Sequence, residues 1–185
     1  MEFTSLTVDT APEPARRLVA ASEKQFGFLP SPVARAARSP ELLQHLFASF
    51  AAYDKSSLSP LEREVVALTV AFENECHYCM ALHSATLAKA DVPPAVLGAL
   101  RAGTELPVPR LEALRTFARA VLLGRGRVPE DVRAAFERAG FDERHALDVV
   151  LGVGVYVLST LSNILTEAPL DPAFEPFRWS KPPAP

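Results

Sequence analysis

Hydrophobic residues recur along this chain at the three- and four-residue intervals that place side chains on one face of a helix. In the segment 41–53, for example, the apolar positions are Leu42, Leu43, Leu46, Phe47 and Phe50. No segment shows a convincing alternation of apolar and polar residues, which would be typical of a half-buried strand. The pattern therefore predicts an all-α fold.

Prolines and glycines divide the pattern into helices, because proline begins a helix well but cannot continue one, and glycine often ends one. The clearest start is Ser59-Pro60-Leu61-Glu62, a capping box with proline at the first helical position. We expect a single helical domain of eight or nine helices over residues 1–168. The predicted helices are 14–26, 32–38, 41–53, 59–74, 76–90, 93–102, 109–123, 129–139 and 142–166.

The tail from 169 to 185 is too rich in proline for a helix. We expect it to run extended. Phe174, Phe177 and Trp179 are too many aromatic residues for a free solvated end. The tail should therefore lie across a hydrophobic groove, on this subunit or on a neighbouring one.

The last helix contains ALDVVLGVGVYVLSTLSNIL, which is nearly long enough to span a bilayer. Asp148 near its start, Gly152 and Gly154, and a polar second half favour a buried helix in a core or subunit interface. Its first half is apolar on every side, which a single amphipathic stripe cannot explain. The glycine pair predicts close approach of another backbone. We expect a homo-oligomer whose interface uses this helix, and no membrane partner.

A faint internal echo links EVVALTV, which begins at Glu64, with DVVLGVG, which begins at Asp148. Each segment opens a long apolar helix with an acidic residue. The second copy has Thr160 and Asn163 where the first has Cys76 and Cys79. The match allows two related helical hairpins, of which only one carries reactive residues.

Composition sets the broad class. With 185 residues, 49% hydrophobic and 22% charged, the chain can bury a sizeable core. The net charge of −3 and the lack of a basic run argue against nucleic acid as a partner. The N-terminus lacks the charged and apolar regions of a secretory signal, and two cysteines cannot form a disulfide scaffold. We expect the reducing cytoplasm, where a close cysteine pair is redox-active or binds metal.

Candidate chemistry is concentrated in ENECHYCMALHS, residues 73–84. On a helix, Cys76, Cys79 and His83 share one face, and two Cα atoms three residues apart lie at roughly 5 Å, within disulfide range. Cys76 falls at the predicted helix N-terminus, where the helix dipole favours a thiolate. His83 lies one turn beyond Cys79 and can accept its proton. Both thiols therefore have a reason to be activated.

Glu64 lies on or beside the apolar face of the preceding helix, where an unpaired carboxylate is costly. The turn between the two helices should lie near Asn74, so an antiparallel hairpin brings Glu64 level with His83. This spacing predicts a relay in which Glu64 orients His83, His83 deprotonates Cys79, and Cys76 completes the pair.

Less specific interpretations exist for each residue. A Cys-x-x-Cys pair occurs by chance, a buried glutamate can pair with an arginine, and His83 can be a core histidine. Zinc could bind Cys76, Cys79, His83 and His77, but a structural zinc site usually draws on two separated ligand pairs, and no second pair exists here. We therefore expect no metal. His45 and His145 have no evident partners, and Tyr78 either shapes access to the cysteines or only packs.

The spacing of Glu64, Cys76, Cys79 and His83, E-x11-C-x2-C-x3-H, resembles the signature of the alkylhydroperoxidase D-like proteins of the carboxymuconolactone decarboxylase superfamily. The resemblance is specific from 59 to 90, and the late helix with NILTEAPLDPAF is also similar. It implies an all-α oligomeric protein that reduces hydroperoxides without a cofactor. The lactone decarboxylases of the superfamily lack this cysteine pair, which argues against that activity.

The same resemblance implies a role for each site residue. Cys79 is the peroxidatic cysteine, and Cys76 is the more exposed resolving cysteine that exchanges with the reductant. His83 acts as base with support from Glu64, and the family's best-known reductant is a lipoylated carrier protein. One departure concerns the residue before the second cysteine, which is histidine in the family and Tyr78 here.

The expected function is therefore thiol-dependent reduction of (alkyl)hydroperoxides through a Cys-x-x-Cys dithiol and disulfide. Two alternatives use the same disulfide. One is a general thiol–disulfide oxidoreductase, and the other is a redox sensor that is not an enzyme. The expected partners are a hydroperoxide substrate, a dithiol reductant and further copies of this chain.

Overall fold

The computed structural model describes residues 2–183 and confirms the all-α prediction for that part of the chain. Nine α-helices are followed by one short 3₁₀ helix, η1, and the predicted helix bounds hold to within two residues. The helices are α1 Glu13–Phe26, α2 Ser31–Ala36, α3 Pro40–Tyr53, α4 Pro60–Glu73, α5 His77–Lys89, α6 Pro94–Ala102, α7 Pro109–Leu123, α8 Glu130–Arg138, α9 Glu143–Leu165 and η1 Pro172–Phe177.

Helix α4 begins at the capping box that the sequence predicted. The Ser59 hydroxyl accepts the Glu62 N–H at 3.3 Å, and the Glu62 carboxylate accepts the Ser59 N–H at 2.8 Å. The other oxygen of Glu62, which is buried, accepts the Arg110 Nε–H at 2.8 Å. These bonds fix where α4 starts. They thereby fix the position of every later side chain along the axis of that helix.

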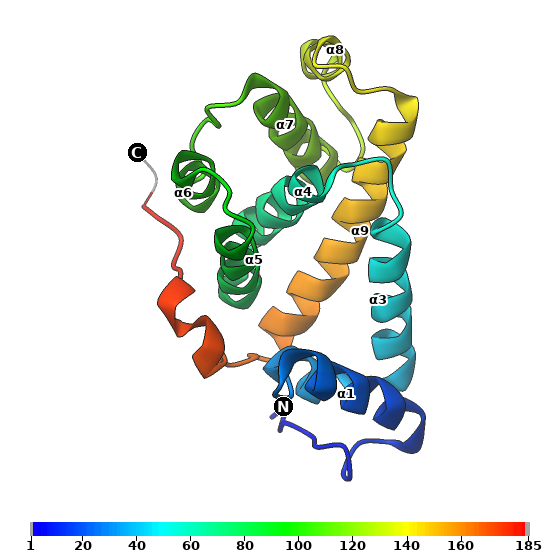
Figure 1. The fold of residues 1–185 in the computed structure, drawn as a ribbon. Coiled ribbons are helices and arrows are strands. Elements are labelled where there is room, and N and C mark those ends of the chain that lie inside the picture. The colour runs from blue at the N-terminus through cyan, green and yellow to red at the C-terminus, as the bar shows by residue number, and fades with distance from the viewer. Residues whose placement is uncertain (1, 184–185) are drawn as a thin grey trace.

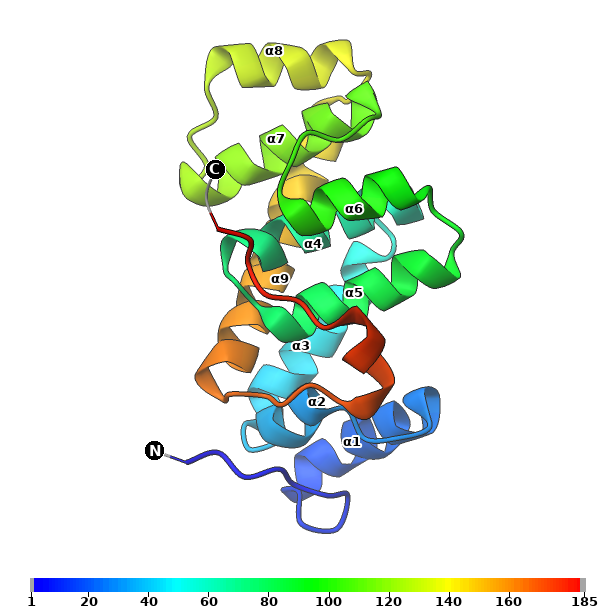
Figure 2. The ribbon, with the colours of Figure 1, turned by 90° about the vertical axis from the view of Figure 1, so that its left-hand side faces the viewer.

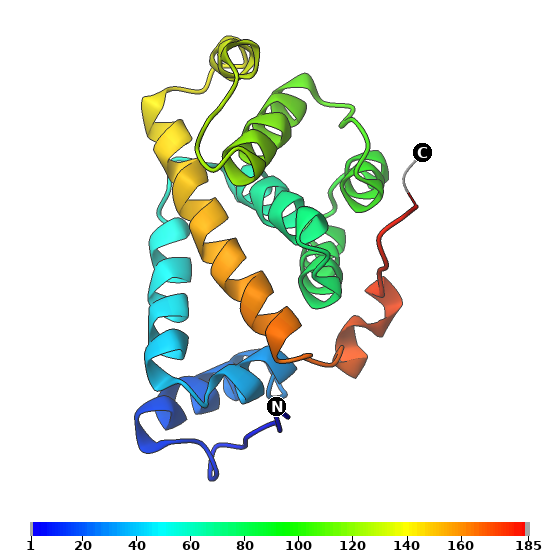
Figure 3. The same ribbon diagram turned by 180° about the vertical axis from the view of Figure 1, so that it is seen from behind.

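The long helix α9 crosses the molecule and packs against α3 on one side and α4 and α7 on the other (Figures 1 and 3). Gly152 faces inward, where an added Cβ would lie 2.5 Å from the Tyr53 ring. The close approach that the glycines predicted is therefore to an aromatic side chain of the same subunit, not to a backbone. Gly154 has no atom within 4 Å of an added Cβ, so it lies on the opposite, open side.

That open side of α9 is apolar. Its exposed large residues are Leu147, Val150, Leu151, Leu161, Ile164 and Leu165. Within residues 2–183, α9 is the one helix long and apolar enough to cross a bilayer, with a mean hydropathy of 1.6 over its most apolar window, of which 44% is buried. One face of the helix thus belongs to the core, and the other face is left uncovered by the described residues 2–183.

The C-terminal tail runs along the outside of α5 and past α6 (Figure 2). The expectation that it is extended throughout is wrong at η1, where the backbone winds into a 3₁₀ helix that includes Pro176. The winding lets Phe174 pack between Phe28 and Tyr78, with ring centroids 6.0 and 5.8 Å away. Further on, Trp179 lies 5.6 Å from the Phe72 ring. The aromatic residues of the tail are thus packed on their own chain.

Candidate active site

The α4–α5 hairpin places the candidate residues. Its turn passes through Asn74 and through Glu75, whose φ of 56° is left-handed, and the Cys76 N–H returns to the Ala71 carbonyl at 2.9 Å. Cys76 is then the N-cap of α5, so its sulfur accepts the Cys79 N–H at 3.4 Å. The predicted position of Cys76 at the helix N-terminus is confirmed, and its sulfur satisfies one of the free N–H groups there.

Glu64 and His83 meet across this hairpin, as the spacing predicted. The Glu64 Oε2 and His83 Nδ1 atoms are 2.8 Å apart, and the side chains are 19% and 12% exposed. Burial by itself would lower the pKa of His83, but the charge and hydrogen bond of Glu64 outweigh burial and raise it. The Tyr156 ring lies edge-on to the imidazole, with centroids 5.2 Å apart. His83 is thus fixed in orientation and favoured in its charged form.

The two cysteines are reduced, and their sulfur atoms are 3.0 Å apart. Cys76 is 1% exposed and Cys79 is 2% exposed. The expectation that Cys76 is the more exposed of the two is therefore wrong in this reduced chain, because the N-cap position folds its sulfur inward over α5. Closing a disulfide needs only a short further approach of the sulfur atoms.

The pKa values of the two thiols are shifted in opposite directions. The pKa of Cys76 is lowered to about 7, chiefly by the hydrogen bond that it shares with the Cys79 sulfur, with help from the Cys79 N–H, Asn163 and the charge of His83 against the cost of burial. The pKa of Cys79 is raised well above the usual range, because of the same hydrogen bond, its burial and the charge of Cys76 beside it. Cys76 is thus the thiol of the pair that ionises more readily. The charge of His83 favours ionisation of Cys76. The direct transfer of the Cys79 proton to His83 remains a prediction.

A residue that the sequence analysis did not select completes the site. Asn163, buried on α9, points its side-chain Nδ2 at both sulfurs, 3.2 Å from Cys79 and 3.9 Å from Cys76. One helical turn away, Thr160 accepts the Asn74 side-chain N–H at 2.8 Å. The signal was present in the internal echo, which aligned Thr160 and Asn163 with the two cysteines.

The other chemically interesting residues lie away from the sulfurs. His77 is exposed, so it points away from the buried cysteines, and within residues 2–183 no cluster of three His, Cys, Asp or Glu side chains could hold a metal ion. Tyr78 is buried, and its hydroxyl donates to Asp171 in the tail at 2.7 Å. His45 is exposed, and His145 belongs to the capping box of α9 with Asp142. Tyr78 thus fastens the tail to α5.

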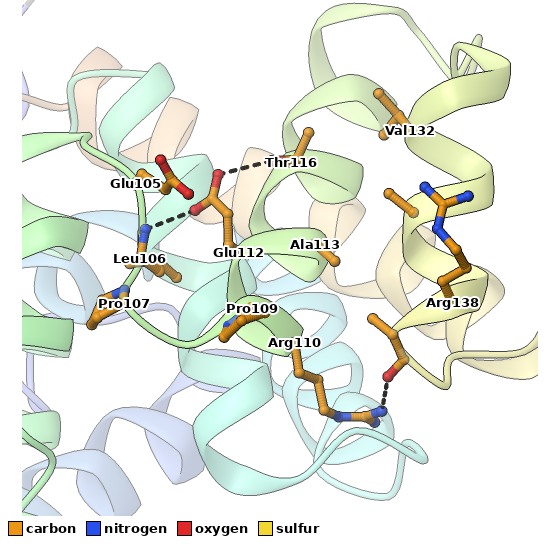
Figure 4. Close-up of a pocket in the computed structure, with 12 residues that line it drawn as sticks. Glu105, Leu106, Pro107, Pro109, Arg110, Glu112, Ala113, Thr116, Val132 and Arg138 are labelled. Carbon is orange, nitrogen blue, oxygen red and sulfur yellow. Dashed lines mark hydrogen bonds between the residues drawn. The ribbon is translucent and has the colours of Figure 1, made fainter.

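One surface groove is separate from this site. It has a volume of about 690 Å³ and lies between the loop before α7, α7 itself and α8 (Figure 4). Polar groups that line the groove form hydrogen bonds with other residues of its wall. Glu112 accepts from the Leu106 N–H and from Thr116, and Arg110 donates to the Ala139 carbonyl. Neither the cysteines nor His83 line the groove, so the dithiol chemistry does not take place there.

Comparisons with known proteins agree with the resemblance drawn from the sequence. The carboxymuconolactone decarboxylase family matches residues 40–121, a range that includes Glu64, both cysteines and His83. The chain matches no curated protein.

Several solved structures share the fold. A peroxidase-related protein from Ralstonia eutropha JMP134, described as an alkylhydroperoxidase AhpD core, superposes with a TM-score of 0.83 at 22% identity over 94% of this chain and 93% of its own. A peroxidase-related protein from Silicibacter sp. TM1040 gives 0.78 at 21% identity over 94% and 93%. The debrominase Bmp8, in complex with 2,3,4-tribromopyrrole, gives 0.74 at 17% identity over 96% and 95%.

Fold and site together define an all-helical dithiol protein of the AhpD-like type, with its Cys-x-x-Cys pair at the start of the second helix of a hairpin. The carboxymuconolactone decarboxylase family matches residues 40–121, and the fold of the AhpD-like neighbour is shared along 94% of the chain, so both comparisons agree with this description.

The unequal thiols predict a clear order of reaction with an alkylating reagent. Because the thiolate is the nucleophile, limiting iodoacetamide should modify Cys76 first, with a rate that rises around pH 7. Cys79→Ala removes the sulfur with which Cys76 shares its main hydrogen bond and should move this midpoint up, towards the ordinary thiol value of about 8.5. Mass spectrometry of peptides quenched across a pH series measures both effects. Initial labelling of Cys79 would contradict the assignment of the lower pKa to Cys76.

Proposed function

We propose that this protein is a thiol-dependent reductase of hydroperoxides, including alkyl hydroperoxides, that works in the reducing cytoplasm. The observation that carries the proposal is a pair of reduced sulfurs 3.0 Å apart, one of low pKa, beside the Glu64–His83 pair. A low-pKa thiol next to a second thiol is the arrangement that peroxide chemistry requires. The superfamily match and the peroxidase-related names of two structural neighbours support it.

The proposed reaction has three steps. A thiolate attacks the terminal oxygen of the hydroperoxide, the O–O bond breaks, and protonated His83 supplies the proton with which the alcohol leaves. The second thiol then attacks the resulting sulfenic acid, releasing water and forming the Cys76–Cys79 disulfide. An external dithiol reduces that disulfide and is itself oxidised. Glu64 keeps His83 oriented and charged between steps.

The resemblance assigns the attack to Cys79, whereas Cys76 is the thiol that ionises more readily. These two statements are compatible if the proton of Cys79 passes to Cys76 across the 3.0 Å sulfur contact before the attack. With limiting peroxide, sulfenic acid trapped on Cys79 in a Cys76→Ser variant supports attack by Cys79. Sulfenic acid on Cys76 in a Cys79→Ser variant assigns the attack to Cys76 instead.

We propose a dithiol on a flexible arm, such as that of a lipoylated carrier protein, as the reductant. Both sulfurs are at most 2% exposed, so a slender dithiol reaches them more easily than a cysteine pair fixed on a folded surface. The competing functions remain a general thiol–disulfide oxidoreductase and a redox sensor. The neighbour Bmp8 is named a debrominase, but at 17% identity it shares the fold alone, and no contact in this site favours that reaction.

Peroxide consumption against a panel of reductants tests this function. We expect sustained turnover of an alkyl hydroperoxide with at least one dithiol donor and no turnover by the Cys76→Ser, Cys79→Ser double variant. Rapid dithiol exchange without peroxide consumption would indicate a general oxidoreductase. A single round of oxidation, with slow recovery in every donor, would indicate a sensor.

Glu64→Gln should impair the reaction while preserving the fold, because an amide keeps the volume but loses the charge that raises the pKa of His83. His83 should then lose its proton at a lower pH, so less of it is charged at neutral pH. We expect peroxide turnover to fall about 10²–10⁴-fold, the usual range for acid–base groups. NMR titration of His83 and turnover across pH 5–9 (roughly the range in which perturbed His and Cys titrate) measure these effects. An unchanged profile would remove Glu64 from the mechanism.

We also propose that the open apolar face of α9 is the contact between copies of this chain in a homo-oligomer. Light scattering at micromolar concentration should give a mass above that of the 20.0 kDa monomer. Leu161→Glu, in the middle of the exposed stripe, should lower it, whereas Leu123→Glu at the end of α7 should not. The two leucines are both 55% exposed, so they form a matched pair. A monomeric wild-type protein would exclude the interface.

A further inference from the structure

The amide of Asn163 is the one contact that α9 makes with both sulfurs in the hydrogen-bond network. Asn163 is 7% exposed, and its side-chain Nδ2 lies 3.2 Å from the Cys79 sulfur and 3.9 Å from the Cys76 sulfur. It lies in the last turns of α9, whose backbone is fixed by Arg35 donating to the Thr166 carbonyl and by the Ala168 N–H donating to Asn163. The amide is therefore held in place and cannot easily turn to solvent.

A buried amide needs good acceptors, because leaving its N–H groups unpaired costs free energy. Neutral thiol and disulfide sulfurs are weak acceptors, whereas a thiolate is charged and accepts strongly. The hydrogen bond of Asn163 is thus much stronger when the pair is reduced and ionised than when it is a disulfide. A contact that favours one redox state shifts the equilibrium towards that state.

Other titratable groups also lie near enough to the sulfurs to interact with their charge. From α5 these are His83, with Glu64 of α4 behind it, and Tyr78, and from α9 Tyr156. Burial raises the pKa of both tyrosines, so they stay neutral through the range used below. His83 and Glu64 are unchanged in Asn163→Leu, which adds no titratable group. A comparison at matched pH therefore isolates the amide.

We propose that Asn163 is a positioning residue that stabilises the thiolate of the reduced pair and so sets how easily the Cys76–Cys79 disulfide is reduced. The proposal rests on the dithiol function above and names the group that tunes it. Asn163 takes no proton and forms no bond to substrate. It acts by making the reduced, ionised pair more stable than the disulfide.

The test is the equilibrium of the full-length protein with glutathione. Two glutathione thiols reduce the disulfide: one sulfur–sulfur bond breaks in the protein, one forms in oxidised glutathione, and two electrons pass to the cysteines. The fraction of protein in each state is read by acid quenching, alkylation and mass spectrometry. The ionisation of glutathione cancels when two proteins are compared at one pH.

Asn163→Leu keeps the shape but removes the donor, so it should raise the pKa of Cys76 by about one unit, which is about the size of one charge-assisted hydrogen bond. Starting from a pKa of about 7, the equilibrium constant for reduction should then fall about eightfold at pH 8.5. At pH 5.5 both proteins hold protonated thiols, and the constant should be unchanged. A merely structural effect would shift it equally at both pH values.

Two further variants keep the test decisive. Asn163→Asp replaces the donor by a carboxylate of nearly equal size that accepts only and repels a thiolate, so its shift at pH 8.5 should exceed that of Asn163→Leu. If Asn163→Leu does not fold, Asn163→Asp alone still tests the proposal. Thr160→Val is the control, because Thr160 is fully buried one turn earlier on α9 and bonds to Asn74 rather than to sulfur. It should leave the constant unchanged within about twofold at both pH values.

The outcomes separate this inference from the function on which it rests. If wild-type protein forms the disulfide but Asn163→Leu and Asn163→Asp match it at pH 8.5, the role of Asn163 is overturned and the dithiol function stands. A shift of equal size at pH 5.5 and 8.5, or one reproduced by Thr160→Val, also overturns it. If the wild-type protein forms no disulfide with oxidised glutathione, both proposals fail.

Discussion

The near-complete burial of α4 is the constraint on which the rest of the structure depends. Its residues 65–71 are all buried, among α5, α6, α7 and α9. A helix enclosed in this way must be apolar, and each polar group that it carries must find a partner inside the protein. Glu62 pairs with Arg110, Thr69 donates to the Val65 carbonyl, and Glu64 pairs with His83. The last pair is thus a requirement of packing as well as a candidate catalytic device.

Much of this arrangement could be predicted from the sequence, because it depends on local spacing. Helix bounds follow from prolines, glycines and caps. That Glu64 and His83 lie opposite each other follows from counting residues on either side of one tight turn. The inward position of Cys76 could not be predicted, because a helix N-terminus says nothing about which side of it other helices cover. The internal echo aligned Asn163 with Cys79 but could not show that the two side chains meet, since this contact joins residues 84 positions apart and depends on how α9 crosses the hairpin.

The prediction of an extended tail was wrong for a related reason. Its prolines exclude an α-helix, but a 3₁₀ turn needs fewer internal hydrogen bonds and tolerates proline better. What selects that turn is tertiary. Asp171 accepts from the Tyr78 hydroxyl and from Ser31, and Phe174 enters the space between Phe28 and Tyr78. Tyr78, which stands where the family has a histidine, is thereby turned away from the sulfurs on either side of it and used to hold the tail.

In the second half of α9 the buried face is polar and the exposed face is apolar, which is the reverse of a usual surface helix. Its buried side includes Ser159, Thr160 and Asn163, whereas its exposed side carries Leu161, Ile164 and Leu165. Polar residues that argued against a bilayer span in the sequence prove to face the interior, and there the Asn163 amide meets the dithiol. A thiolate in a protein interior needs donors around it, and the inward Asn163 amide supplies one to this cysteine pair. The outward leucines have no such explanation within one chain, and a second copy of the chain would supply it. One helix thus connects the proposed redox site with the proposed subunit contact.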